Sequence, residues 1–108
     1  MTTSSTPEIL VAEWLILHKI PFNAQESMLG GTTETGGARI DFYITESNII
    51  IRIQSYWHTL PNAMAKDVMQ KIALINEGYI VVDVWERRLT ENPDLVMKAA
   101  LQGRELGE

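Results

Sequence analysis

The sequence predicts an α/β fold in which a mixed four-stranded sheet is flanked by helices. Residues 38–44 alternate apolar and polar side chains, and after a turn at 45–48 the next strand, 49–54, places Ile49, Ile51 and Ile53 on one face, which is typical of an antiparallel hairpin. Residues 79–85 form a nearly continuous β-branched run, which is typical of a strand covered on both faces. The segment between the last two strands is long enough for a parallel crossover through a helix.

The first two elements precede the hairpin. The Thr-Pro pair at 6–7 is typical of a helix start, and apolar residues recur at helical spacing from there to about position 18. Residues 20–27 predict a short strand, and Pro21 near its start places that strand at a sheet edge because proline cannot donate to a ladder. A glycine-rich loop over 28–37 then leads into the hairpin.

Two more helices are predicted in the second half of the chain. Helical periodicity extends over residues 64–76, and Gly78 provides a C-cap. The Asn-Pro pair at 92–93 opens the last helix. The expected order is therefore helix, strand, hairpin, helix, strand and helix.

The chain of 108 residues has the length of one domain, which we place at 7–101 between a polar tail at 1–6 and a C-terminal tail at 102–108. It has no cysteine, which excludes disulfides, thiolate zinc sites and thiol catalysis. A domain this small lies near the lower limit of self-sufficiency, so it is compatible with a homodimer.

Charge and hydropathy narrow the class of protein further. The net charge of −5 argues against a protein that coats nucleic acid by neutralising phosphates, although it leaves room for a nuclease with a local basic rim. The apolar runs are too short to cross a bilayer, and the polar N-terminus is unlike a signal peptide. We therefore expect a cytoplasmic protein without a membrane partner.

The hairpin gathers polar side chains on one face of two neighbouring strands. If residues 45–48 close a four-residue turn, Asp41 faces Arg52 and Arg39 faces Gln54. The simplest interpretation is a solvent-facing side of an antiparallel pair with a cross-strand ion pair. The alternative is a functional site at this place.

Other candidate residues have equally plain interpretations when taken alone. His58 follows an aromatic pair and is more often a packing residue than a catalytic base, and Trp57 either covers the core or stacks on bases. Glu13 has the position of a solvated helix carboxylate. Asp67 and Lys71 are spaced for a local ion pair on one helix.

The order of several short motifs resembles the PD-(D/E)XK, or restriction-endonuclease-like, nuclease superfamily. The motifs are GGARIDF at 36–42, IIIRIQSYWH at 49–58, Asp67 on a helix, and GYIVV at 78–82. The closest branch is that of very-short-patch-repair endonucleases and small phage or bacterial resolvase-like proteins. The similarity covers residues 7–93, and it implies an αβββαβα core and hydrolysis of DNA with Mg²⁺ or Mn²⁺.

The resemblance also implies roles for individual residues. Asp41 matches the first metal ligand, and Gln54 matches the residue that orients the attacking water. Glu13 matches an additional ligand from the first helix, with Glu8 as the second choice. His58 matches a histidine that assists the water or the leaving group, and Asp67 matches an aspartate that steadies this histidine or the neighbouring loop.

One position departs from the family pattern, because Arg52 stands where an acidic ligand is expected. A guanidinium opposite Asp41 would neutralise the carboxylate and repel a cation. Either Arg52 turns away from Asp41 and contacts a DNA phosphate, in which case Arg39 and Trp57 also contact the DNA, or the centre is inactive. The first case predicts a metal-dependent endonuclease or junction resolvase. The second predicts a silent nuclease-fold module that binds nucleic acid or protein, or a structural or assembly domain.

Overall fold

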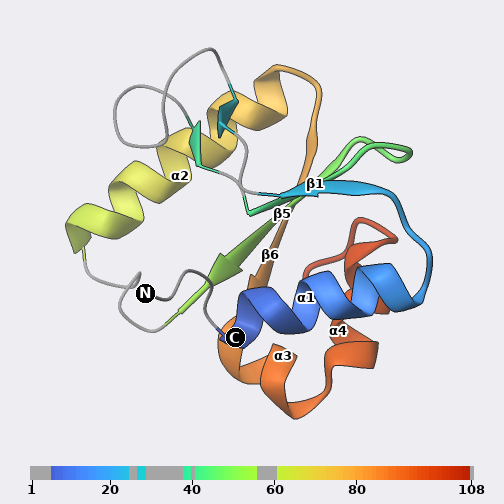
Figure 1. Ribbon diagram of the computed structural model, residues 1–108. Coiled ribbons are helices and arrows are strands. Elements are labelled where there is room, and N and C mark those ends of the chain that lie inside the picture. Colours follow the sequence, from blue (N-terminus) through green and yellow to red (C-terminus); the bar gives the residue numbers. More distant parts are fainter. Residues whose placement is uncertain (1–5, 25–26, 29–37, 40, 56–60, 108) are drawn as a thin grey trace, which may run out of the picture.

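The structure is a computed structural model that describes residues 6–24, 27–28, 38–39, 41–55 and 61–107 (Figure 1). Its elements, in order, are α1 (Thr6–Leu17), β1 (Phe22–Ala24), β2 (Ser27–Met28), β3 (Ala38–Arg39), β4 (Phe42–Ile44), β5 (Ile49–Gln54), α2 (Pro61–Asn76), β6 (Ile80–Trp85), α3 (Glu86–Glu91) and α4 (Pro93–Ala100). The predicted α/β fold is confirmed.

The main sheet has four strands in the order β1-β4-β5-β6, and β2 pairs with β3 in a small separate ladder. The pairs β1/β4 and β4/β5 are antiparallel, whereas β5/β6 is parallel, so the sheet is mixed as predicted. The predicted hairpin register is also confirmed, because Ile44 pairs with Ile49. Asn48 closes the turn with a φ of 60°, a left-handed conformation that asparagine tolerates well.

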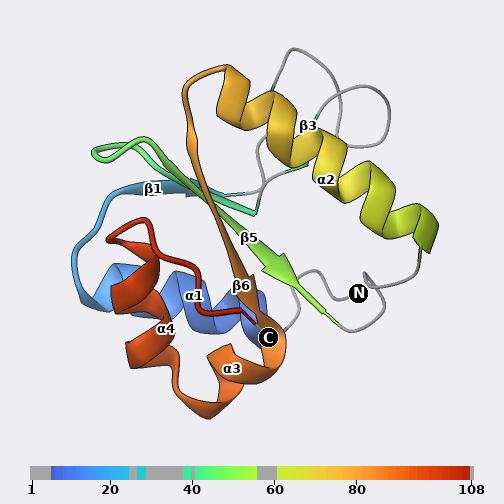
Figure 2. The same cartoon turned by 180° about the vertical axis from the view of Figure 1, so that it is seen from behind.

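Helices cover both faces of the sheet, with α1, α3 and α4 on one face and α2 on the other (Figures 1 and 2). The larger apolar core lies beneath the three helices, and its buried members are Val11, Leu15, Phe42, Ile44, Ile49, Ile51, Ile53, Val82, Val84, Leu89, Val96, Met97 and Ala100. The core beneath α2 is small and consists of Ile50, Leu74 and Val81, with two partly buried tyrosines. All six residues of β5 are buried because this central strand has a helical layer on each side.

The strand predicted over 38–44 is broken in two. Asp41 lies in a bend between β3 and β4, and its Oδ2 accepts the backbone N–H of Ile53 at 2.7 Å. A side chain thus takes the place of a ladder carbonyl, which an alternating pattern cannot reveal. The first strand is shorter than the predicted 20–27, since the described strands there are β1 and the two-residue β2.

The C-terminal half contains one helix that the sequence did not predict. Helix α3 follows β6 without a loop, and its Leu89 is fully buried. Helix α4 begins as predicted, with Pro93 in its first turn and the Asn92 side chain accepting the Leu95 N–H at 3.2 Å. Within the described part of the chain, no helix combines the length and apolar character needed to cross a bilayer.

The segment that follows α4 folds back along β6, the last strand of the sheet (Figure 2). Glu105 Oε2 accepts the Asp83 N–H at 2.9 Å, which pairs one backbone donor of this edge strand. Leu106 packs against the larger apolar core. The C-terminal residues up to 107 are therefore tied to the domain.

Candidate functional site

The carboxyl ends of β5 and β6 lie side by side, because the two strands are parallel and Gln54 is paired with Trp85. In open α/β sheets, ligands usually bind beyond the carboxyl ends of the strands. Side chains of Arg52, Gln54 and Asp83 in this part of the sheet make their contacts with α2 or with one another. The candidate site is therefore at this end of the sheet, on the side that α2 covers.

Asp41 lies beside β5, at Ile53, the next-to-last residue of that strand. Its carboxylate accepts the N–H of Ile53, and its own N–H lies 3.3 Å from the Ile51 carbonyl oxygen. Only 4% of Asp41 is exposed. A hydrogen bond from a backbone N–H to a carboxylate is stronger than one between neutral groups, so this contact fixes the Asp41 carboxylate at Ile53, the residue that precedes Gln54.

The predicted cross-strand ion pair between Arg52 and Asp41 is wrong, because Arg52 pairs with other carboxylates. The guanidinium forms an ion pair with Asp67 of α2 and a second one with Asp83 of β6, where Nε and Oδ1 are 3.2 Å apart. The reason is the parallel register, which places Asp83 directly beside Arg52. Among the described residues, no ion pair joins Arg52 to Asp41.

The interpretation of this face as solvent-facing is also wrong, because Arg52 is 2% exposed and Gln54 is 3% exposed. Helix α2 covers these side chains, and burial of polar groups is tolerated because they are paired. A buried guanidinium held by two carboxylates is poorly placed to contact a DNA phosphate. Arg52 instead supports the side chains around it.

Gln54 and Asp67 form a second pair under α2. Gln54 Nε2 donates to Asp67 Oδ2 at 3.2 Å, while the other oxygen of Asp67 is held by Arg52. This network sets the orientation of the amide, with the NH₂ group toward Asp67. Within the described ranges, no residue donates a hydrogen bond to the Oε1 atom of Gln54.

The predicted local ion pair between Asp67 and Lys71 is not formed. Lys71 Nζ instead lies 3.1 Å from Asp83 Oδ2 and 2.6 Å from Glu105 Oε2. Burial by itself would lower the pKa of Lys71, but the hydrogen bond to Glu105 and the charge of Asp83 outweigh it and raise the pKa above 10.5.

We call the ion-paired side chains that join α2, the sheet and the C-terminal segment the ion layer; its members are Arg52, which is buried, and the more accessible Asp67, Lys71, Asp83 and Glu105. It joins four parts of the chain, and sequence reasoning missed it. The available signal was Asp83, a lone acidic residue in a strand that is otherwise apolar. Its Oδ1 atom is buried without a directed hydrogen bond, although it lies 3.2 Å from the Arg52 guanidinium, so charge alone compensates it.

The structure describes only some of the remaining predicted site residues. Glu13 is exposed on α1, whereas Glu8 is half-buried in the first turn of this helix, which begins near the end of β6 (Figures 1 and 2). His58, Trp57 and the side chain of Arg39 lie outside the described residues. Within the described ranges, no three His, Cys, Asp or Glu side chains are grouped closely enough to hold a metal ion.

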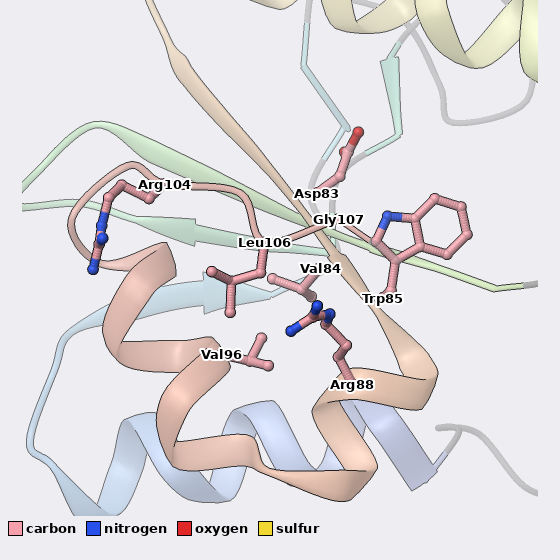
Figure 3. A pocket seen from close by; sticks show the side chains of 8 residues that line it. All are labelled: Asp83, Val84, Trp85, Arg88, Val96, Arg104, Leu106 and Gly107. Carbon is pink, nitrogen blue, oxygen red and sulfur yellow. The ribbon is translucent and has the colours of Figure 1, made fainter.

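A small pocket opens between β6, α3, α4 and the C-terminal segment (Figure 3). It is lined by Asp83, Val84, Trp85, Arg88, Val96, Arg104, Leu106 and Gly107. Its empty volume of about 200 Å³ is partly open to solvent and falls below the size of ordinary ligand sites. Figure 3 shows Leu106 above Val96, while the Arg104 side chain points away, so the two arginines do not converge.

Comparison with known proteins identifies a structural relative. No family model and no curated protein sequence matches the chain. The structure of the catalytic domain of the homing endonuclease I-Bth0305I is similar, with a TM-score of 0.69 and 22% sequence identity. The similarity covers 93% of this chain and 94% of that domain. The chain therefore has a nuclease-like fold, as predicted.

Proposed function

We propose that the protein is a metal-dependent endonuclease that hydrolyses phosphodiester bonds in DNA. The observation that carries this proposal is the similarity of nearly the whole chain to the structure of an endonuclease catalytic domain. Arg52 forms its ion pairs with Asp67 and Asp83, so it does not occupy the Asp41 carboxylate. The nuclease-like fold supports the same reaction class, because the similar structure is an endonuclease catalytic domain and the similarity covers nearly the whole chain.

The residues at this place suit a hard divalent cation. Mg²⁺ prefers oxygen donors and is usually bound through one or two carboxylates together with waters and substrate phosphates. Asp41 supplies a carboxylate oxygen, the type of donor that Mg²⁺ and Mn²⁺ prefer. The ion would stabilise phosphoryl charge and lower the pKa of a bound water.

We assign the other roles by the same proposal. Gln54 orients the attacking water, His58 acts as general acid or base, and Asp67 steadies this part of the site. Glu8 in the first turn of α1 supplies a further ligand in preference to Glu13, because Glu13 is exposed on the helix that covers the opposite face of the sheet from α2. Arg39 and Trp57 contact the DNA, and the protein works in the cytoplasm as a homodimer of phage or bacterial type.

A cleavage assay tests the proposal. The purified chain is incubated with plasmid, single-stranded and four-way-junction DNA in Mg²⁺, Mn²⁺ or EDTA. Asp41→Asn is the control, because its amide oxygen can still accept the Ile53 N–H while the negative charge is lost. Metal-dependent cutting that disappears in this variant is expected. If none of the three substrates is cut with either metal, the proposal is refuted.

A silent nuclease-fold module is the second candidate, and one observation favours it. Arg52 occupies the place of an acidic ligand, so the site has one carboxylate fewer than the family pattern. DNA binding that weakens with salt and occurs without cleavage would select this module. If the chain neither binds nor cuts DNA, a structural or assembly role remains.

A further inference from the structure

The guanidinium group of Arg52 is held on two sides. Its Nε lies 3.2 Å from Asp83 Oδ1, while Nη2 forms an ion pair with Asp67 Oδ1. Both terminal nitrogens also lie 3.5 Å from the backbone carbonyl oxygen of Asp67. A guanidinium presents its N–H groups in a fixed plane, so one side chain can contact a strand and a helix together. Arg52 therefore fixes Asp67 of α2 relative to β6, the strand that carries Asp83.

The position of the Asp67 carboxylate depends on this contact. The Asp67 side chain is 31% exposed, so without a cation on the sheet it could turn toward water, whereas the Arg52 side chain is 3% exposed. A charged contact is stronger at a buried site than in water, so Arg52 keeps one carboxylate oxygen on the inner side of the helix. The second oxygen, Oδ2, then accepts the Nε2 group of Gln54 at 3.2 Å.

The amide of Gln54 depends on Asp67 in turn. Only 3% of Gln54 is exposed, so loss of the acceptor would leave a buried NH₂ group unsatisfied. An ionised carboxylate accepts hydrogen bonds and cannot donate them, so the amide turns its NH₂ group toward Asp67 and its Oε1 atom away. The end of the amide that faces away from Asp67 is therefore an acceptor, which is what an O–H group of water requires.

We propose that Arg52 is a positioning residue for DNA hydrolysis, and that it acts through Asp67 to hold the Gln54 amide in the orientation that receives an O–H group of the attacking water. This inference rests on the proposed function, which assigns that water to Gln54. It gives the arginine at the position of the acidic ligand a role without contact to metal or DNA. Loss of Arg52 should misplace Gln54 but not Asp41, because the Ile53 N–H holds the Asp41 carboxylate separately.

Lys71 provides a matched control, because it is the other cation of the ion layer. Its ion pairs are with Asp83 and Glu105, and among the described residues no contact joins it to the Gln54 side chain. Lys71→Met therefore weakens the layer but keeps the contacts that lead from Arg52 to Gln54. A role of Arg52 in stability alone predicts the same behaviour from Lys71→Met and Arg52→Met.

Hydrogen exchange of the Gln54 NH₂ group, followed by NMR on the ¹⁵N-labelled chain, tests the orientation without DNA or metal. We expect this group to exchange at least about tenfold more slowly than the exposed Gln102 amide in the native chain and in Lys71→Met, and to lose that protection in Arg52→Met. The Ile53 N–H should stay protected in all three, which shows that β5 is folded. If Arg52→Met does not fold, Arg52→Lys takes its place, since an ammonium cannot bridge both carboxylates in the same way. Unchanged protection of Gln54 in the Arg52 variant overturns the proposal.

Cleavage kinetics, normalised to the folded fraction of each variant, test the effect on the reaction. Arg52→Met should lower kcat about 10–100-fold while KM changes much less, as expected for a misplaced catalytic group. In a Gln54→Ala background the same substitution should change kcat by less than about twofold, because the residue through which it acts is gone. Lys71→Met should cut DNA at the native rate.

The outcomes separate this inference from the proposed function. If the native chain cuts DNA but the losses from Arg52→Met and Gln54→Ala are independent, or Lys71→Met loses as much activity as Arg52→Met, the positioning role is refuted. A native chain that cuts no DNA refutes the proposed function instead. The exchange measurement then still decides whether Arg52 orients the Gln54 amide.

Discussion

Replacement of Arg52 by methionine tests whether the ion layer holds α2 on the sheet. The variant keeps a long apolar side chain but removes one of the two cations that compensate three carboxylates. Removing one partner of a buried ion pair costs about 3–5 kcal/mol, because the other charge stays buried without compensation. The Asp67 side chain is 31% exposed, and Asp83 keeps Lys71 at 3.1 Å. We therefore expect a loss of unfolding free energy at the lower end of this range, about 3 kcal/mol.

Urea unfolding followed by circular dichroism measures this loss. The midpoint should fall while the m-value stays unchanged, and the melting temperature should fall by about 12 °C or more for a domain of this size. Arg87→Met is the matched control, because the Arg87–Glu91 pair is solvent-exposed at 3.5 Å and should contribute only a few tenths of a kcal/mol, about 0.3–0.5. If Arg52→Met destabilises the protein no more than this control, the ion layer is not what holds the helix.

Three further predictions concern single side chains. Asp41→Ala should lower the free energy of unfolding by about 1–3 kcal/mol, because it leaves the buried Ile53 N–H without an acceptor, whereas Asp41→Asn should unfold at a urea concentration close to that of the native chain. Glu105→Gln should shift alkaline unfolding to lower pH. The raised pKa of Lys71 means that its stabilisation is complete below pH 10.5 and is lost as the pH rises through the native pKa, which the variant lowers. Leu89→Ala should cost about 2–5 kcal/mol in urea unfolding, since this fully buried side chain anchors α3.

Much of the fold could be predicted because it depends on local patterns. Alternation in 42–44 and 49–54, together with the turn length, determined the β4/β5 register. The missing features depend on contacts that are distant in the chain. The break at Asp41 requires the N–H of Ile53 as its partner, and α3 is only six residues long and follows a strand without a turn signal.

The site was harder to predict for the same reason. The antiparallel register alone placed Arg52 opposite Asp41, but the partner of a central strand residue is also determined by the strand on its other side. That strand brings Asp83, while α2 brings Asp67 and the C-terminal segment brings Glu105. An acidic residue inside the apolar run at 80–85 was the one local sign that a buried cation had to lie nearby.

The ion layer bears on the exposed apolar side chains of α2, which are Met64, Val68, Met69, Ile72 and Ile75. Buried ion pairs contribute little net stability, since desolvation offsets most of the attraction between the charges. In the part of the chain that the structure describes, the apolar burial beneath α2 comes from the small core around Leu74. A helix attached in this way gains more from covering its outer side than an ordinary amphipathic helix does, because each exposed apolar side chain that becomes buried adds about 1.5–3 kcal/mol at full burial. Covering these side chains would therefore stabilise the same helix that holds Asp67 against Gln54.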